Sequence, residues 1–311
     1  MKMCGQVFGR GSLKYVLTNS MPAGPAVAEE VNKYAELYDG LSTLMAEYDL
    51  EPSVEQYGVA VGAVVRYQLG QKKQIWIQPA GSGKSRVLVL VGLLMQKVNK
   101  KFKSIYVYYS HEVLRQTDDR IWTRIAATSA VPFERRIMPD LTGVGPSSLI
   151  LVDEADYMLF DLAVVFKATQ TVIGLTATCT DLSKEAYQQY IRQFQYDIIQ
   201  SGIKPGTKRA AAEHLVNITA ADFFSTPGGR MPQLVFLHAE MVEEYNALAV
   251  NMGNTVVVNC SDIDVVRHLQ PAYTYLVTEE VLMRGVDYHS DNDEGIRLLI
   301  AAPMTSQRAL E

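Results

Sequence analysis

The sequence predicts an α/β protein built of two tandem lobes with parallel sheets. Apolar runs typical of strands alternate with helix-length segments, at the spacing expected of a parallel sheet covered by helices. A glycine-rich loop of the phosphate-binding type joins one of these strands to a helix. The alternation restarts after a segment rich in Gly and Pro. The 311 residues are enough for two domains of ordinary size.

Composition along the chain sets the predicted boundaries. Residues 1–50 are expected to be a helical N-terminal extension, because apolar residues recur at helical spacing between Ala26 and Tyr48. Beyond it we expect a first lobe at residues 51–204 and a linker rich in Gly and Pro at 205–232. A second lobe, short of one or two strands, is expected at 233–311.

Individual elements follow from the same patterns. In the first lobe, helical periodicity predicts helices at Val54–Leu69 and Ser85–Val98. Short runs rich in β-branched and aromatic residues predict strands at Ile75–Ile77, Ser104–Tyr109, Ser148–Val152 and Thr171–Leu175. In the second lobe, similar runs predict strands at Gln233–His238, Thr255–Asn259, Tyr273–Thr278 and Arg297–Ala301.

Charge and composition limit the classes of partner. With 29 basic and 34 acidic residues the net charge is −5, so a polyanion would have to be bound by a local groove. The three cysteines are too few and too scattered for a disulfide framework or a zinc cluster. The longest apolar run, Val87–Met95, is far shorter than a membrane span, and no secretory signal is visible, so we expect a cytoplasmic protein without a membrane partner.

The strongest motif is the phosphate loop at Gln78–Ser85, which reads QPAGSGKS. A strand precedes it and a helix follows it, as phosphate binding requires. Glycines allow the backbone N–H groups to point at phosphate oxygens, the lysine can reach the β- and γ-phosphates, and the serine can bind Mg²⁺. The predicted nucleotide-binding residues are Gly81, Ser82, Gly83, Lys84 and Ser85. Gln78 is a departure, because this first position is usually Gly or Ala.

A second motif lies about 70 residues further along, where an apolar strand ends in Asp153-Glu154-Ala155-Asp156. Parallel strands place carboxylates at the edge of the sheet where ligands bind. We expect Asp153 to hold Mg²⁺, and Glu154 to orient and deprotonate an attacking water. Together the two motifs predict binding of ATP and Mg²⁺, with Lys84, Asp153 and Glu154 as the catalytic residues.

These motifs resemble the ATPase core of the superfamily 2 helicases, which carry the DExD/DEAD motif, and the resemblance covers the chain from about Val54 onward. It implies two RecA-like lobes. Thr176-Ala177-Thr178 is similar to the Ser/Thr-Ala-Thr motif, so the resemblance implies that Thr176 and Thr178 couple the nucleotide state to lobe closure.

A further match lies in the second lobe. Thr278 to Asp287 is similar to the family's Thr-…-Arg-Gly-x-Asp motif, with one residue more than usual between Thr278 and Arg284. The resemblance places Thr278 and Arg284 at nucleic acid or the lobe interface, and Asp287 near the ribose and the interface. In the family, an arginine-finger segment would follow the last residue of this sequence. Whether this chain alone hydrolyses ATP is therefore left open. We expect it to be part of a longer polypeptide, which could be a viral one.

Gln56 is a candidate for reading adenine, since an amide can pair with both a donor and an acceptor on a base edge. An exposed helix glutamine without a ligand is the alternative.

Three functions remain open. The first is an ATP-dependent helicase or translocase that hydrolyses ATP between two lobes and acts on single-stranded nucleic acid, with RNA favoured over DNA. The second is a protein-translocating ATPase of the SecA kind. The third is a helicase-like structural or regulatory subunit that does not hydrolyse ATP.

Overall fold

The structure is a computed structural model in which the chain forms two compact units, Met1–Gly206 and Thr207–Glu311. The described residues are 52–79, 82–111, 122–123, 125, 132–177, 185–201, 213–216, 218–225, 229–260, 268–279, 282, 288 and 295–302. The predicted helical extension at 1–50 lies outside them.

The first unit contains a sheet in which every paired strand is parallel to its neighbours. Its described strands follow the order β3-β2-β4-β5-β1-β6 across the sheet. Their bounds are β1 Lys73–Ile77, β2 Ser104–Tyr109, β3 Phe133–Ile137, β4 Ser148–Asp153, β5 Thr171–Thr176 and β6 Asp197–Gln200. The strand that leads into the phosphate loop, β1, is separated from the strand that carries the acidic motif, β4, by β5 alone.

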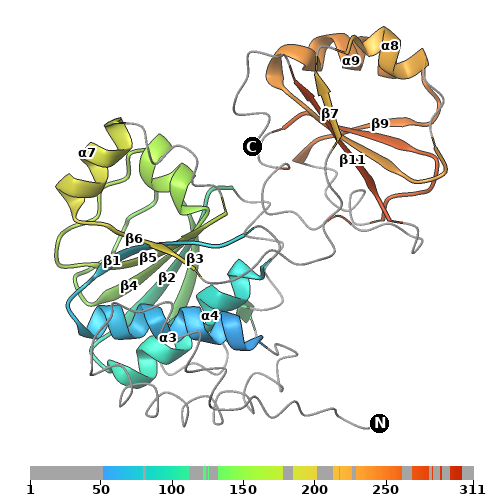
Figure 1. Ribbon diagram of the computed structural model, residues 1–311. Helices are drawn as coiled ribbons and strands as arrows, with labels where there is room; N and C mark the ends of the chain where they lie inside the picture. The colour runs from blue at the N-terminus through green and yellow to red at the C-terminus, as the bar shows by residue number, and fades with distance from the viewer. Residues whose placement is uncertain are drawn as a thin grey trace, which may run out of the picture. The chain divides into compact units, whose positions relative to one another are not determined.

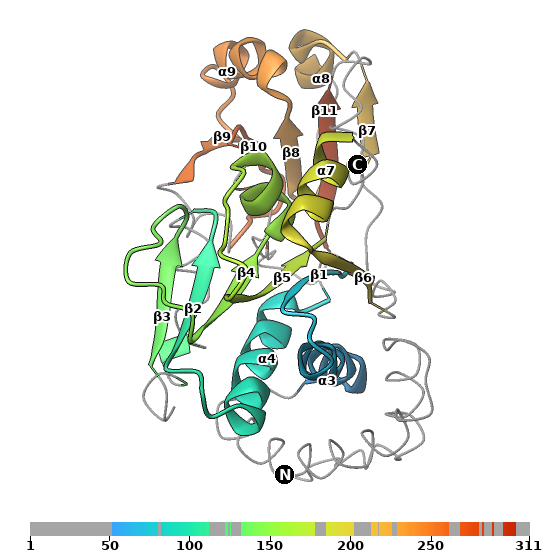
Figure 2. The same ribbon diagram turned by 90° about the vertical axis from the view of Figure 1, so that its left-hand side faces the viewer.

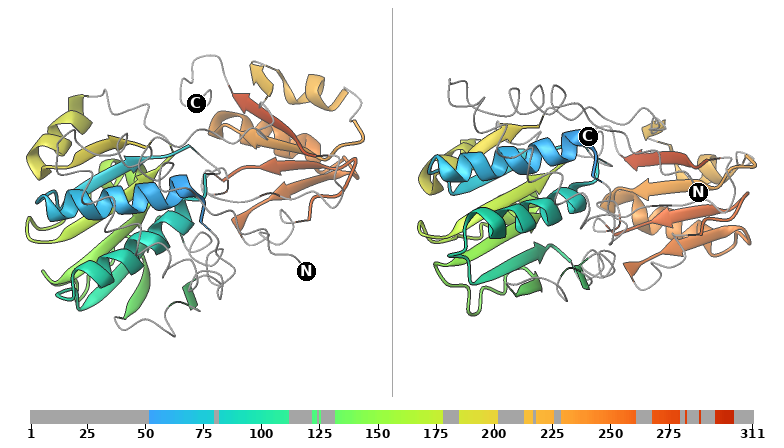
Figure 3. Two further views of the ribbon diagram at one scale, coloured as in Figure 1. Left: turned by 60° about the horizontal axis from the view of Figure 1, so that its bottom comes forward. Right: turned by 90° about the horizontal axis from the view of Figure 1, so that it is seen from below.

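Helices cover both faces of this sheet (Figures 1 and 2). Helices α3 (Val54–Gln68) and α4 (Lys84–Val98) lie side by side on one face, as Figure 3 also shows. Helix α7 (Glu185–Phe194) lies on the other face, where its aromatic residues pack with the short π-helix η1 (Tyr157–Asp161). The first unit is therefore a three-layer α/β/α arrangement.

The core explains why the strands read as continuous apolar runs. All residues of β4 and β5 are buried, because helices cover the sheet on both sides. The buried side chain of Gln74 is hydrogen-bonded in this core: its amide N–H donates to the carbonyl oxygen of Ala63 in α3 at 3.0 Å, and its amide oxygen accepts from the Trp76 indole at 2.9 Å. The bond to Ala63 joins β1 to α3.

Gly174 of β5 allows the closest approach between this sheet and the acidic motif. A Cβ atom at Gly174 would lie 2.5 Å from the Cβ of Ala155, well inside normal contact distance. We therefore expect Gly174→Ala to destabilise the protein by about 2 kcal/mol through overpacking, measured by urea denaturation. Gly145→Ala is the matched control, because a Cβ there meets nothing within 4 Å, and a change of more than about 0.5 kcal/mol is not expected. Equal stability of the two variants would contradict this prediction.

The second unit also contains a parallel sheet, whose described strands follow the order β7-β11-β8-β10-β9. The strands are β7 Glu213–Val216, β8 Gln233–Leu237, β9 Thr255–Val258, β10 Thr274–Val277 and β11 Arg297–Ala302. Helices α8 (Ala220–Ser225) and α9 (Val242–Ala249) pack against the apolar side chains of this sheet, with Tyr245 buried in the shared cluster (Figure 1). The two parallel sheets confirm the predicted α/β class of tandem RecA-like lobes.

The predicted linker at 205–232 is too long. It contains β7, which pairs with β11 of the second sheet, and α8, which joins the second core. Gly and Pro residues at 202–206 and 227–232 flank this segment, so its overall composition is that of a linker. The strand and the helix between them are too short to change that composition. None of the helices in the described part of the chain is long and apolar enough to cross a membrane.

Candidate functional site

The phosphate loop lies at the carboxyl end of β1 and leads directly into α4. Gly83 precedes the helix with a φ of 79°, a left-handed conformation that favours glycine. Among the described residues, no side chain caps the first turn of α4, where Lys84 and Ser85 lie. Free N–H groups and the positive end of the helix dipole can therefore bind an anion. Gly81 lies outside the described residues.

The acidic motif reaches the same place from β4. The Lys84 ammonium lies 3.3 Å from Glu154 Oε1, and both side chains are largely buried, at 11% and 6% exposed. Glu154 itself has a φ of 49°, an uncommon value outside glycine, and its N–H donates to Asp153 Oδ1 at 3.1 Å. The structure thus brings together the lysine and the glutamate that the sequence predicted to be catalytic, although they are 70 residues apart (154 − 84).

Burial raises the pKa of Glu154 from its ordinary value of 4.5 to about 7, partly offset by Lys84, while Asp153 and Asp156 raise it further. A carboxyl group poised near neutral pH is suited to act as a general base. Because its pKa is higher in the folded than in the unfolded protein, burial of Glu154 costs nothing below pH 4.5 and destabilises the fold increasingly up to about pH 7.

If Glu154 is the base, kcat/KM for ATP hydrolysis should fall about tenfold per pH unit below pH 7, because the protonated acid cannot accept a proton. A pH–rate profile between pH 5.5 and 8.5 measures this. In Glu154→Gln the residual rate should lose this inflection. An inflection that persists in the variant would assign the titration to another group.

The sequence-predicted coupling residue Thr176 contacts the acidic motif directly. Its hydroxyl donates to Asp156 Oδ1 at 2.6 Å, so the end of β5 is joined to the segment that follows β4. Strand β5 lies between β1 and β4, and the N–H of Gln78 donates to the Thr176 carbonyl oxygen at 2.8 Å. Thr176 therefore links the phosphate loop to the acidic motif. Thr178 lies outside the described residues.

Gln56 is neither exposed nor simply available to a base. It is 8% exposed and occupies the third position of α3, where its Oε1 accepts from the Ser53 N–H at 2.9 Å and completes a capping box. Its Nε2 donates to the Ser82 carbonyl oxygen of the phosphate loop at 2.8 Å. A Cβ at Gly83 would lie 2.3 Å from this nitrogen. The exposed-glutamine alternative is wrong: Gln56 holds the phosphate loop against α3.

Nucleotide binding by Gln56→Ala distinguishes two roles for Gln56, holding the phosphate loop in place and recognising the adenine base. Loss of loop support should weaken ATP and GTP binding by a similar factor, about tenfold, because the contact is to the loop backbone. Adenine reading would weaken ATP selectively. Titration of both nucleotides measures the difference, with Ser53→Ala as the control, which removes the hydroxyl half of the capping box and keeps the loop contact.

Gln78 occupies the first position of the phosphate loop, where Gly or Ala is usual, and the sequence alone indicates no role for it. Its side chain is fully buried, and its Oε1 accepts from the Ser82 hydroxyl at 3.4 Å. Among the described residues its Nε2 has no hydrogen-bond partner, and neither has the buried hydroxyl of Ser201, which follows the neighbouring strand β6. Buried polar atoms of this kind usually bind water or a ligand group. The presence of glutamine at a position where Gly or Ala is usual is the feature of the sequence that points to this residue.

The donor set fits Mg²⁺ bound largely through phosphate and water. Ser85 offers a hydroxyl and Asp153 a carboxylate, while the described residues hold no cluster of three or more His, Cys, Asp or Glu side chains suited to a metal ion. Mg²⁺ in nucleotide sites is typically held by one or two protein oxygens together with the phosphates.

Of the residues predicted in the second lobe, only Thr278 is described. It follows β10, which lies between β8 and β9, at the carboxyl edge of that sheet. Its neighbour Glu279 accepts a hydrogen bond from the Cys260 thiol, and burial raises the pKa of that thiol to about 12. Arg284 and Asp287 lie outside the described residues.

The fold and the site together define an α/β protein with a phosphate loop facing an acidic strand end. No protein-family model matches the sequence, and the curated proteins contain no match to it. Among solved structures, the chain is similar to the DUF1998 helicase MrfA bound to DNA, with a TM-score of 0.46 and 13% identity. The similarity covers 81% of this chain and 46% of that one, so the chain spans less than half of that structure's length.

Proposed function

We propose that this chain is an ATP-dependent motor of the helicase or translocase type that acts on single-stranded nucleic acid. The observation that carries the proposal is the buried contact between Lys84 of the phosphate loop and Glu154 of the acidic motif. A structural salt bridge alone would not need a loop whose helix N-terminus is left uncapped. The motif resemblance to superfamily 2 helicases supports nucleic acid as the partner, with RNA placed ahead of DNA.

The Lys84–Glu154 contact suggests how nucleotide binding prepares the site. A phosphate group at the start of α4 competes with the Glu154 carboxylate for the Lys84 ammonium. Glu154 is then released to orient a water and accept its proton, which a carboxyl of pKa about 7 can do near neutral pH. Ser85 and Asp153 would hold Mg²⁺, which neutralises charge on the phosphates when bound.

Thr176 supplies the proposed route from the nucleotide to the rest of the protein. Its hydroxyl is bonded to Asp156, and its carbonyl oxygen accepts from Gln78. A shift of the acidic motif on ATP binding would therefore also move the end of β5. Thr178, which the resemblance assigns to coupling, would respond to that shift together with Thr278 and Arg284, which it assigns to nucleic acid or the lobe interface. Asp287 would lie near the ribose and the interface.

An ATPase assay with added polymers tests the proposal against its alternatives. Stimulation by poly-RNA or single-stranded DNA is the expected result, and the ratio of the two rates decides the RNA preference. Stimulation by unfolded protein instead would favour a SecA-like translocase. ATP binding without hydrolysis, in a longer parent polypeptide as well as in this chain, would favour a regulatory subunit.

A further inference from the structure

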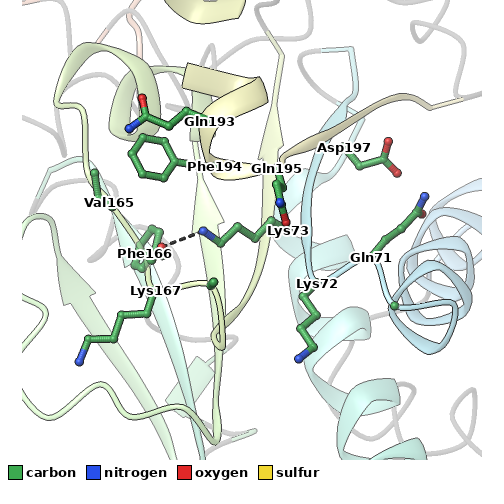
Figure 4. A pocket seen from close by; sticks show the side chains of 12 residues that line it. Gln71, Lys72, Lys73, Val165, Phe166, Lys167, Gln193, Phe194, Gln195 and Asp197 are labelled. Atoms are coloured by element: carbon green, nitrogen blue, oxygen red, sulfur yellow. Dashed lines mark hydrogen bonds between the residues drawn. The ribbon is translucent and has the colours of Figure 1, made fainter. Parts of the chain in front are cut away.

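A cavity lies in the first unit at the start of β1, the end of that strand away from the phosphate loop. Figure 4 shows the residues that line it. Its volume is about 680 Å³, and it is lined where β1 and β6 begin, by residues that include Lys73 and Asp197. The phosphate loop follows the other end of β1, after Ile77. This cavity is therefore separate from the nucleotide site.

Lys73 is an unusual residue for such a position. It is only 6% exposed, and its ammonium donates to the Phe166 carbonyl oxygen at 2.7 Å. The nitrogen also lies 5.6 Å from the Phe194 ring and 5.4 Å from the Tyr196 ring. Within the described part of the chain no carboxylate forms an ion pair with it. Burial lowers its pKa, which reflects the cost of keeping this charge away from water.

The charges around the cavity do not balance. Lys72 and Lys167 also line it, and both side chains are exposed at its rim. The lining carboxylate, Asp197, already forms an ion pair with Arg66 at 2.7 Å. Three lysines thus line a cavity whose one described carboxylate already has a partner. An anion would provide the counter-charge that a buried lysine needs.

The remaining lining sets the size and character of the ligand. Phe166 and Phe194 contribute aromatic surface, and Gln71, Gln193 and Gln195 contribute residues with amide groups (Figure 4). A cavity of this volume, with mixed apolar and polar walls, is in the range of small-molecule sites. The same aromatic surface would not be needed by a bare inorganic ion.

We propose that this cavity binds a small organic anion, carrying a phosphate or carboxylate group, with Lys73 as its main contact. The oxyanion accepts from the ammonium N–H groups that Phe166 leaves unused, and Lys72 and Lys167 attract it at the rim. The apolar part of the ligand packs on Phe166 and Phe194. This site does not depend on the nucleotide chemistry at the other end of β1.

Calorimetric titration tests this proposal with citrate as the carboxylate probe and phenyl phosphate as the phosphate probe. The titrations use Lys84→Ala as the background, because the phosphate loop could itself bind phosphate. We expect at least one probe to bind, and Lys73→Met, which keeps the length of the buried chain, to weaken that binding at least tenfold. Lys101→Met is the matched control at an exposed lysine outside the cavity and should leave the affinity unchanged.

Equal affinity in Lys73→Met and its background would overturn the proposal, as would binding of neither probe. Circular dichroism checks that Lys73→Met is folded. If it is not, the double substitution Lys72→Gln and Lys167→Gln decides, since both side chains are exposed: a several-fold weaker affinity supports the site and an unchanged one rejects it. Binding of an RNA oligonucleotide that depends on Lys73, with no binding of either small probe, would also reject a small-molecule ligand.

Discussion

Replacing Glu154 by glutamine is expected to lower kcat for ATP hydrolysis by about 10²–10⁴-fold, the usual effect of losing a general base. ATP should bind at least as tightly as before. In the wild-type protein the Glu154 carboxylate holds the Lys84 ammonium at 3.3 Å, and glutamine removes the charge that competes with phosphate. Single-turnover hydrolysis measures the chemical step, and titration with a fluorescent ATP analogue measures binding.

Glu185→Gln is the matched control, because Glu185 is exposed on α7, away from the acidic motif. Its rate should equal that of the wild-type protein. The pattern sought is loss of kcat with retained affinity in Glu154→Gln alone. A wild-type rate in Glu154→Gln would show that this carboxylate is not the base, and a loss of affinity with unchanged kcat would make it a binding residue.

The elements that carry the site could be predicted from sequence because each has a local cause. Buried parallel strands read as apolar runs, as in β4, and the glycine of the phosphate loop marks the start of α4. The meeting of Lys84 with Glu154 followed from a general property of parallel sheets, whose strands deliver their carboxyl ends to one edge. The remaining motifs, such as Thr176-Ala177-Thr178, could be predicted only because they follow in the order known from the family they resemble.

The features that sequence did not reveal depend on contacts between distant segments. Gln56 is the third residue of a helix, and nothing near it in the chain indicates that its amide reaches Ser82. Lys73 reads as an ordinary charged residue at the start of a strand, and only the fold buries it beside Phe166. Strand β7 has four residues and lies between two Gly- and Pro-rich stretches, so its pairing with β11 was invisible locally.

Lys84→Ala is expected to abolish ATP binding and also to destabilise the protein in a pH-dependent way. Removing one partner of a buried ion pair leaves the other charge uncompensated. Here that partner is Glu154, whose pKa Lys84 normally lowers, so the pKa should rise above 7 in the variant. Because Glu154 can instead take up a proton, the cost at pH 8, one unit above its wild-type pKa of about 7, is limited to about 1.4 kcal/mol. At pH 5 Glu154 is protonated in both proteins and the variant should be nearly as stable as the wild type. At pH 8 it should be clearly less stable.

Urea denaturation at both pH values, with Lys97→Ala as the control on the exposed side of α4, measures this difference. Adding Glu154→Gln to Lys84→Ala should restore most of the stability at pH 8, since the double variant buries no unpaired carboxylate. ATP binding should not return, because it depends on the ammonium group itself. The two functions of Lys84, neutralising Glu154 and binding phosphate, would then be separated in one set of variants. A stability loss of the same size at pH 5 and pH 8 would instead assign the effect to lost packing of the lysine side chain.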